Sequence, residues 1–285
     1  MFTKMMICTD LTPASFSLIA CAMELKEIGT KEVVLAHVVE SLAAVSGTLL
    51  DAEAESVFRQ QKEMLEQQRV KVIGEILHGA PVQTLVEAAE RHDVSGILMG
   101  SHSKTLITLG TLGSVSDALM ARTQRPLLLH RVDLGEGGAI KERDGGNIFS
   151  HVLFPTDFSE TAERALDYLG KIALEQRGTI TLLHVISPDE DPVGTRSEEE
   201  AQYLLEAKKR RLERLGATEV NVDLVHGKPD NEVVARGKRG IFSLVVMGCQ
   251  GKGILKRVFM GSTAEAVARH IEVPLLLIPG VQHME

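Results

Sequence analysis

The chain has 285 residues and a mass of 31.0 kDa, a length that suggests two domains or one large one. Hydrophobic residues make up 44% and charged residues 25%, which excludes a mainly disordered chain, and no apolar run approaches the ~18 residues of a membrane-spanning helix. The formal net charge is −8 and aromatic residues are only 4%, so we do not expect a nucleic-acid-binding protein with a basic face.

The N-terminus and the cysteines favour a cytoplasmic protein. The chain opens with a short strand-like run and lacks the charged segment, apolar segment and cleavage site of a secretion signal. Its cysteines, Cys8, Cys21 and Cys249, are odd in number, widely spaced and without a CxxC pair. A disulfide framework and a structural zinc site are therefore not expected. No His, Cys and carboxylate residues have metal-ligand spacing, so we assign no metal site.

The two halves of the chain alternate strand and helix patterns in the same order. Short apolar runs, typical of buried parallel strands, are followed by segments with apolar residues at helical spacing. In the second half the predicted elements are strand 152–155, a helix with Ser159 as its N-cap, strand 179–185, helix 197–215, strand 219–225, helix 229–239, strand 241–247, helix 262–270 and strand 274–278. The first half follows the same order. This order predicts an α/β fold with an open, doubly wound parallel sheet in each half.

Matching landmarks indicate that the second half repeats the first. They recur in the same order, 147 or 148 residues apart. The matched segments are 4–10 with 151–157, 36–38 with 183–185, 78–81 with 226–229, 98–100 with 246–248, 113–114 with 261–262, and 125–129 with 273–277. We therefore predict two domains, 1–134 and 148–285, joined by a glycine-rich linker of mixed charge over 135–147.

Two loops of the second half could hold a ligand. In an open parallel sheet, ligands bind beyond the carboxyl ends of strands, where the strand order reverses. Residues 155–157 follow the first strand, and the glycine-rich segment 248–263 follows the fourth. The glycines let the backbone approach a ligand, and Ser262 and Thr263 add hydroxyls at a helix N-terminus, where N–H groups favour anions. The loop also carries Lys252, Lys256 and Arg257. These parts favour a phosphate site, although the loop is neither a P-loop nor a GxGxxG motif.

The spacing of Gly248, Gly251 and Gly261-Ser262 resembles the nucleotide motif of the universal stress protein family. In both halves, the aspartate after the first strand, the His-Val that ends the second, the His-Gly-x-Pro before the third helix and the final x-Pro-Leu-Leu-Leu are also similar to that family. The resemblance implies two tandem five-stranded sheets of the adenine nucleotide alpha hydrolase type, with strand order 3-2-1-4-5. It also implies that the domains pair through their last strands, 127–129 and 275–278, as an intrachain pseudo-dimer, and that chains could form a homodimer.

The same resemblance implies an adenine nucleotide, ATP, ADP or AMP, with Mg²⁺ arriving on the phosphates. The residues that it carries over are Pro155, Thr156 and Val185 at the adenine, Asp157 at the ribose or the base-proximal side, Met247 and Gly248 at the sugar and first phosphate, and Gly251, Gly261, Ser262 and Thr263 at the phosphates.

The first half departs from the motif. Ser103 stands where the second glycine is expected, and Lys104 is the basic residue of that loop. If this position requires a positive φ, serine there costs ~1–2 kcal/mol, or roughly 5- to 30-fold in affinity. We therefore expect nucleotide mainly in the second half. The corresponding residues of the weaker first site are Thr9, Asp10, Val38, Met99, Gly100, Gly113, Ser114 and Val115.

The leading hypothesis is a nucleotide-binding regulatory protein of the stress response, which signals to a protein partner that the sequence does not name. Two alternatives remain open. Asp157 with a bound Mg²⁺ could support slow ATP hydrolysis, although no general base or arginine finger can be assigned and we assign no catalytic residue. The second alternative is an interaction module that binds no nucleotide and in which both loops are only structural.

Several conspicuous residues have simpler interpretations. His37 and His184 end predicted strands, and we expect satisfied core or rim residues there. Cys249 lies in the proposed phosphate loop, where a lowered thiol pKa is conceivable, but a small packed residue is favoured. The charged helix 197–215 is interpreted as a solvated face, including Lys208.

Overall fold

The structure is a computed structural model that describes residues 1–40, 52–100, 113–131, 147–187, 197–238, 241–250 and 260–280. The chain divides into two compact units, Met1–Gly145 (unit 1) and Gly146–Glu285 (unit 2). The predicted linker, 135–147, lies almost wholly outside the described residues and stays a prediction. Within the described ranges, no helix combines the length and the apolar character needed to cross a membrane.

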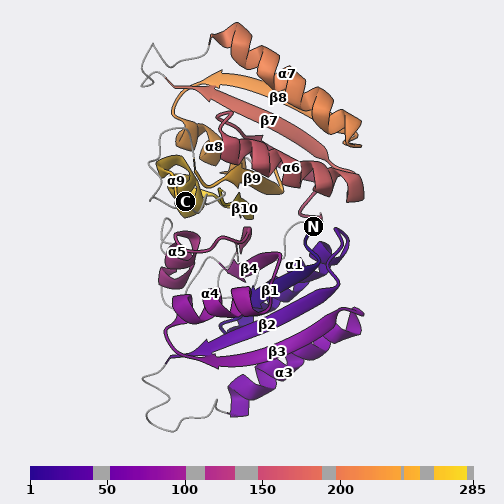
Figure 1. Cartoon of the computed structure of the whole chain (residues 1–285), viewed down its shortest axis with the longest axis vertical. Coiled ribbons are helices and arrows are strands. Elements are labelled where there is room, and N and C mark those ends of the chain that lie inside the picture. The colour runs from indigo at the N-terminus through magenta and orange to yellow at the C-terminus, as the bar shows by residue number, and fades with distance from the viewer. Residues whose placement is uncertain are drawn as a thin grey trace. The chain divides into compact units, whose positions relative to one another are not determined.

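Unit 1 alternates strands and helices along its sequence (Figure 1). Its strands are β1 (Lys4–Cys8), β2 (Glu32–Val39), β3 (Lys71–His78), β4 (Gly96–Gly100) and β5 (Leu127–His130). Its helices are a 3₁₀ turn (Pro13–Ser15), α1 (Phe16–Lys26), α3 (Ala52–Gln67), α4 (Pro81–Arg91) and α5 (Ser114–Met120). The strands form a parallel sheet in the order β3-β2-β1-β4-β5.

Unit 2 repeats this arrangement. Its strands are β6 (His151–Pro155), β7 (Thr179–Ile186), β8 (Glu219–His226), β9 (Leu244–Gly248) and β10 (Leu275–Ile278). Its helices are α6 (Glu160–Glu175), α7 (Glu198–Arg214), α8 (Pro229–Lys238) and α9 (Ser262–His270). The order β8-β7-β6-β9-β10 is again parallel throughout. The predicted duplication of a five-stranded α/β fold with order 3-2-1-4-5 is thus confirmed.

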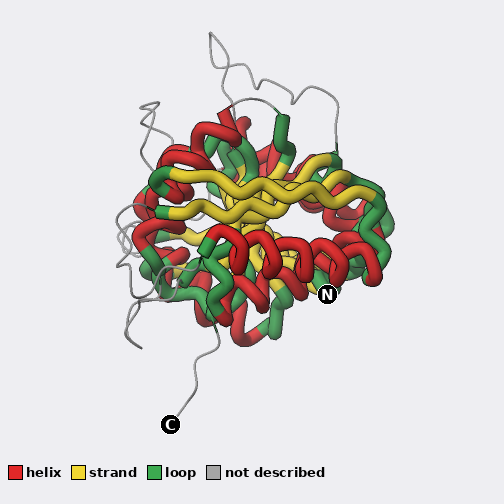
Figure 2. The backbone as a smooth tube through the Cα atoms, turned by 90° about the horizontal axis from the view of Figure 1, so that it is seen from above, coloured by secondary structure: helices red, strands yellow, loops and turns green. Residues whose placement is uncertain are grey.

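The helices cover both faces of each sheet, as Figure 2 shows for helices (red) and strands (yellow). In unit 2, α6 and α7 are joined by an ion pair between Lys208 and Glu163, while α8 packs against α9. In unit 1, α1 contacts α3 and α4 contacts α5. The central strands are therefore covered from both sides, which explains why their sequences are continuously apolar.

One strand begins later than the hydrophobic pattern predicts. The expected strand 241–247 starts at Leu244, and Ile241 is 58% exposed. Ser243 explains the difference, because its hydroxyl accepts the His151 N–H at 2.9 Å and donates to the Ile148 carbonyl at 2.8 Å. These side-chain bonds hold the chain at the edge of β6 before the ladder with β9 begins.

The His-Gly-x-Pro landmarks form equivalent turns after the third strand of each unit. Gly79 and Gly227 have φ of +144° and +151°, a region that side chains rarely adopt. Each turn leads into a helix whose first residue is proline, Pro81 or Pro229, where the missing N–H costs nothing. The repeated sequence therefore encodes a repeated change of direction from the third strand into the third helix.

Helix α7 follows the predicted charge order but is not wholly solvated. Ser197 caps it by accepting the Glu200 N–H at 3.1 Å, with acidic residues in the first turn and Arg211 and Arg214 in the last. The interpretation of the whole charged face as solvated is wrong for Lys208, which is only 8% exposed.

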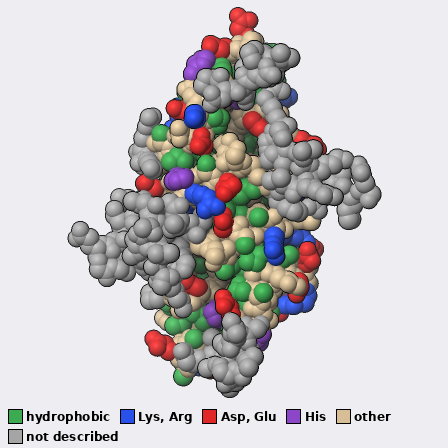
Figure 3. Space-filling view, turned by 90° about the vertical axis from the view of Figure 1, so that its left-hand side faces the viewer, with side chains coloured by type: hydrophobic (Ala, Val, Ile, Leu, Met, Phe, Trp, Pro, Cys, Tyr) green, Lys and Arg blue, Asp and Glu red, His purple; other side chains and the backbone are tan. Residues whose placement is uncertain are grey.

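On the face drawn in Figure 3, acidic and basic side chains are interspersed among the described residues.

Candidate functional site

The chain turns sharply at the carboxyl end of β6, through residues 156–158 (the 156–158 turn). The Thr156 hydroxyl accepts the Phe158 N–H at 3.1 Å, and the Asp157 carboxylate accepts the Ser159 N–H at 3.0 Å. Phe158 has a φ of +61°, which non-glycine residues adopt infrequently. Short-range side-chain bonds therefore hold the turn in an uncommon conformation and fix the backbone of Asp157.

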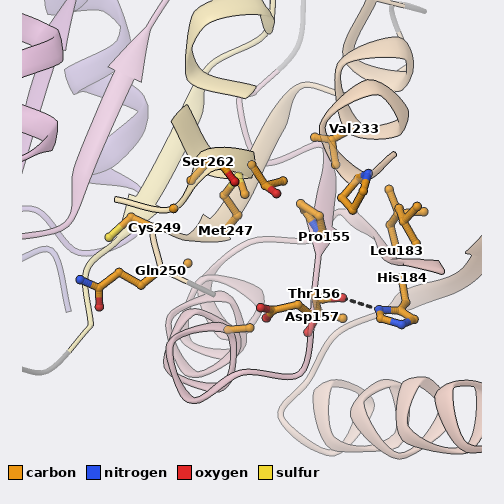
Figure 4. A pocket seen from close by; sticks show the side chains of 17 residues that line it. Pro155, Thr156, Asp157, Leu183, His184, Val233, Met247, Cys249, Gln250 and Ser262 are labelled. Atoms are coloured by element: carbon orange, nitrogen blue, oxygen red, sulfur yellow. Dashed lines mark hydrogen bonds between the residues drawn. The ribbon is translucent and has the colours of Figure 1, made fainter. Parts of the chain in front are cut away.

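His184 of β7 supports this turn from the neighbouring strand. Its Nδ1 lies 2.7 Å from the Thr156 carbonyl oxygen, the bond drawn in Figure 4. Because a carbonyl only accepts hydrogen bonds, Nδ1 carries the hydrogen. The imidazole also packs against Phe158, with ring centroids 4.5 Å apart. His184 is thus a satisfied rim residue, as predicted.

The second loop begins at the end of β9 and returns to helix α9. The Cys249 N–H donates to the Ile278 carbonyl at 3.0 Å, and the Gly261 N–H donates to the Cys249 carbonyl at 2.7 Å. Gly261 is the N-cap of α9, so the N–H groups of Ser262 and Thr263 lie in its first turn. Residues 251–259 lie outside the described part, and the predicted roles of Gly251, Lys252, Lys256 and Arg257 there stay predictions.

Gly248 lies at a close approach between β9 and α6. A Cβ placed on it would be 2.8 Å from Thr161 Cγ2 and 3.0 Å from the Thr161 carbonyl carbon. The start of α6 therefore packs directly on the backbone of position 248. Glycine is required here by the available space, in addition to any role toward a ligand.

The two loops line one cavity of about 400 Å³. Figure 4 shows Met247 and Ser262 on one side of it and Leu183, His184 and Val233 on the other. The predicted residues that line it are Pro155, Thr156, Asp157, Val185, Met247, Gly248, Gly261, Ser262 and Thr263. The cavity also has lining residues that the sequence analysis did not single out for the site: Ala162, Leu183, Pro229, Val233, Gln250 and Ala264.

Cys249 lines the same cavity but is not an activated thiol. Its side chain is 5% exposed, and burial raises the pKa of the thiol above its ordinary value. The structure does not support the alternative of a lowered pKa, because desolvation outweighs the hydrogen bonds of the Gly280 and Cys249 backbone and the attraction of Arg164. In the part of the chain that the structure covers, no three His, Cys, Asp or Glu side chains gather closely enough to hold a metal ion.

Unit 1 repeats the backbone frame of this site. His37 Nδ1 lies 2.9 Å from the Thr9 carbonyl, the Asp10 carboxylate accepts the Thr12 N–H at 3.0 Å, and Leu11 has a φ of +59°. A cavity of about 580 Å³ lies at the corresponding place. Its lining includes all the residues of the predicted weaker site: Thr9, Asp10, Val38, Met99, Gly100, Gly113, Ser114 and Val115. Ser103 and Lys104 lie outside the described residues.

The family is decided by a match that runs through both units. The model of the universal stress protein family matches residues 1–131 and 149–279. The chain belongs to the universal stress protein family. It carries two such domains in tandem, in agreement with the duplication found in the sequence.

Relatives of several lengths share this family. A universal stress protein of Methanocaldococcus jannaschii is 30% identical over 148 residues, which cover 48% of this chain and 85% of the relative. A longer one from Synechocystis is 22% identical over 252 residues, 87% of this chain and 79% of its own. The crystal structure of a universal stress protein from Archaeoglobus fulgidus is 25% identical, with a TM-score of 0.72 and coverage of 96% and 95%. Some universal stress proteins bind nucleotides, and one has been solved in complex with cAMP.

Lys208, which lies behind the site and does not line the cavity, was also missed by sequence reasoning. It lies with Leu205 and Leu212 in the buried stripe of α7, and its ammonium is 5.4 Å from the centre of the Phe158 ring. Helical spacing carried the signal, because positions 205, 208 and 212 share one face. The surrounding run of charged residues concealed it.

Proposed function

We propose that unit 2 binds an adenine nucleotide, ATP, ADP or AMP, and that the chain is a nucleotide-dependent regulatory protein of the stress response. One observation carries the proposal. The loops after β6 and β9, the strands on either side of the point where the strand order reverses, line a single cavity. Open α/β sheets take their ligands at this position.

The apolar part of the cavity suits a purine base. Pro155, Leu183, Val185 and Val233 line it together with Met247, and about 400 Å³ falls within the ~300–1,000 Å³ of small-molecule sites. A flat heterocycle buried against these side chains gains from burial of apolar area. Polar groups at the edge would fix its orientation.

The polar part of the cavity suits a sugar and phosphates. The Asp157 carboxylate can accept hydrogen bonds from ribose hydroxyls. The first-turn N–H groups of α9, with the hydroxyls of Ser262 and Thr263, can donate to phosphate oxygens. Mg²⁺ would arrive with the phosphates, which bind it through oxygen.

We propose weaker binding in unit 1 on the same physical grounds. Val115 stands where unit 2 has Thr263, so a hydroxyl donor is missing at the start of α5. The cavity is also lined by Glu40 in addition to Asp10. A second carboxylate repels an anionic ligand and disfavours a polyphosphate.

We propose binding rather than turnover as the activity. Besides Asp157, the ionisable residues that line the described part of the cavity are His184 and Cys249. His184 directs Nδ1 to Thr156, and burial raises the pKa of the Cys249 thiol. His184 is buried and supports the 156–158 turn, so we assign it a structural role, assign no general base and expect single-turnover assays to leave bound ATP unchanged.

A titration with a matched variant in each unit tests the proposal. The full chain would first be denatured to release any bound nucleotide, which is quantified by chromatography and mass spectrometry. The refolded, nucleotide-free chain would then be titrated calorimetrically with ATP, ADP and AMP, with Mg²⁺ and with EDTA. We expect about one nucleotide per chain, with affinity lost in Asp157→Asn and kept in Asp10→Asn.

Other outcomes of this titration would contradict specific parts of the proposal. Equal losses in the two variants would contradict the asymmetry between the units. An absence of nucleotide uptake would contradict nucleotide binding and favour the interaction module. A Mg²⁺-independent affinity would contradict the role given to the metal.

We further propose that the two units pair with each other and that chains form a homodimer. We also propose a regulatory protein partner and a cytoplasmic location. The sequences of β5 and β10, LLLH and LLLI, are almost wholly apolar and suit a strand-mediated contact. Small-angle X-ray scattering of the full chain would test the pairing. Paired units give a compact profile, whereas two separated units give an extended one.

A further inference from the structure

Lys208 is a buried cation that lies directly behind the 156–158 turn. Its Nζ forms an ion pair with the Glu163 carboxylate of α6 and lies 5.4 Å from the centre of the Phe158 ring. A buried ammonium is costly unless it is compensated. Here the compensation comes from Glu163, from the face of an aromatic ring and from the charge of Asp157. The cation is therefore held beside the residue that we assign to the ribose.

We propose that Lys208 is a positioning residue for the nucleotide site of unit 2, whose ammonium fixes Phe158 and Asp157 and thereby makes nucleotide affinity depend on pH. The proposal rests on the function proposed above. It adds a residue outside the cavity lining, on a helix that contributes no lining residue among those described.

The contacts around Phe158 explain how a residue on α7 can act on the site. The ring lies between the imidazole of His184, 4.5 Å away, and the ammonium of Lys208. Asp157 precedes Phe158 directly, so the packing of the ring restrains the backbone of the turn that carries the carboxylate. Loss of the cation removes a contact to Phe158 and a charge that attracts Asp157.

Unit 1 shows what Lys208 adds. The buried stripe Phe58, Gln61 and Leu65 of α3 matches 205, 208 and 212 of α7 at the repeat distance of 147 residues. Gln61 donates to the Ser15 hydroxyl at 2.7 Å, and Leu11 replaces Phe158 at nearly the same φ. The turn therefore forms without a cation. Unit 2, the unit expected to bind nucleotide, has in addition the charge of Lys208 and the Phe158 ring that this charge contacts.

Burial and the charges that face Lys208 together set its protonation in the relevant range. Burial, with a smaller effect of Arg211 in the same direction and an opposing effect of Asp157, lowers the pKa of Lys208 to about 8. Arg211 itself pairs with Glu163, at 3.3 Å, and with Asp167. As the pH rises through this value, Lys208 loses its proton and the site loses the cation. Nucleotide affinity should fall over the same range.

The test compares the ATP affinity of three full-length proteins by calorimetry between pH 7.5 and 9.5, well above the phosphate ionisation near ~6. We expect the affinity of the unmodified chain to fall about 3- to 10-fold over this range. Lys208→Met should bind more weakly at pH 7.5 and show no such fall. Arg210→Met, an exposed change on the same helix, should follow the unmodified chain. A Lys208→Met profile that matches the unmodified chain would overturn the proposal.

A ligand-free measurement separates this inference from the proposed function. The amide resonance of Asp157 and the ring resonances of Phe158 should shift with a midpoint near pH 8 and remain constant in Lys208→Met. If the chain takes up no nucleotide, the proposed function fails, and the pH-dependent shifts of the Asp157 and Phe158 resonances alone decide whether Lys208 controls the turn. If these resonances do not shift with pH near 8, the inference is overturned.

A second variant covers the case in which Lys208→Met does not fold. Glu163→Gln removes the paired carboxylate and leaves Lys208 beside Arg211, so the midpoint should move to lower pH. An unchanged midpoint would overturn the proposal.

Discussion

The imidazole of His184 donates to the carbonyl oxygen of Thr156 at 2.7 Å, joining the end of the second strand to the turn after the first. His37 makes the equivalent bond to Thr9 at 2.9 Å. Duplication has thus preserved the backbone frame of the site in both units. The differences between the units lie in the side chains and loops around this frame.

Replacing His184 by Phe should weaken nucleotide binding without unfolding unit 2. The aromatic contact to Phe158 is kept, while one hydrogen bond is lost, which costs about 0.5–1.5 kcal/mol. Calorimetric titration with ATP and urea denaturation would measure the two effects. His37→Phe is the matched control, and we expect a similar loss of stability with unchanged ATP affinity. A loss of affinity in the control would contradict the assignment of the main site to unit 2.

Alanine at Gly248 should be much more damaging than alanine at Gly100. A Cβ at 248 would lie 2.8 Å from Thr161 Cγ2, and we expect a loss of about 1–3 kcal/mol in the free energy of unfolding. At 100 the nearest atoms are the Leu18 methyl groups, at 3.9 and 4.0 Å. Urea denaturation of the two variants would measure the difference. Equal stabilities would show that α6 does not press on β9 as described.

The stability of the chain should rise with pH because of Lys208. Its pKa is about 8 in the folded chain and near 10.5 when unfolded, so between these values the unfolded chain binds the additional proton. The free energy of unfolding then increases with pH over this window. Urea denaturation at pH 8, 9 and 10 should show the increase in the unmodified chain and in Arg210→Met. Lys208→Met should lack this contribution. If the free energy of unfolding of that variant rises with pH as steeply as that of the unmodified chain, the prediction is contradicted.

The N-cap of α6, Ser159, should affect nucleotide binding, whereas the N-cap of α7, Ser197, should not. The Ser159 hydroxyl accepts the Ala162 N–H at 3.2 Å and also lies 3.5 Å from the Gln250 carbonyl, so it joins the helix to the loop after β9. Ser159→Ala should cost about 1 kcal/mol as a cap and also weaken nucleotide binding. Ser197→Ala removes a cap from α7 and should cost similar stability with unchanged affinity. Calorimetry would compare the nucleotide affinities of the two variants, and thermal denaturation would compare their stabilities. Equal effects on affinity would contradict a role of Ser159 in joining α6 to the loop after β9.

Cys249 should react slowly with iodoacetamide in the folded chain. Burial raises the pKa of this thiol, and it raises that of Cys8 to about 12, so little thiolate is present at pH 7.5. Mass spectrometry over time would follow the labelling of each cysteine. Unfolding in urea should accelerate it strongly at both positions. Rapid labelling of native Cys249 would revive the activated-thiol interpretation.

The fold was predictable because its determinants are local and repeated. Runs such as Leu244–Met247 identify buried parallel strands, and the matched landmarks give both halves the same connections. Element boundaries depend also on contacts distant in sequence, as Ile241 shows. An apolar side chain there predicts a strand, yet the hydroxyl of Ser243 bonds to the backbone of His151 and delays the start of β9.

The location of the candidate site was predictable from topology. Since β6 and β9 are adjacent and parallel, the segments after their carboxyl ends meet at the same edge of the sheet. This relation brings Asp157 and Gly261 to one cavity across more than a hundred residues of sequence. The chemistry of the ligand depends instead on the side chains and backbone groups that line the cavity.

Sequence alone established the duplication, the alternation of strands and helices and the two loops that line the cavity. Each of these depends on periodicity or on repeated short motifs. The burial of Lys208 behind Phe158 and the close packing of α6 on Gly248 became visible in the folded chain alone. Desolvation and close contact depend on which elements pack together across the fold. A charged residue in a charged helix carries the same local pattern whether it faces water or a neighbouring loop.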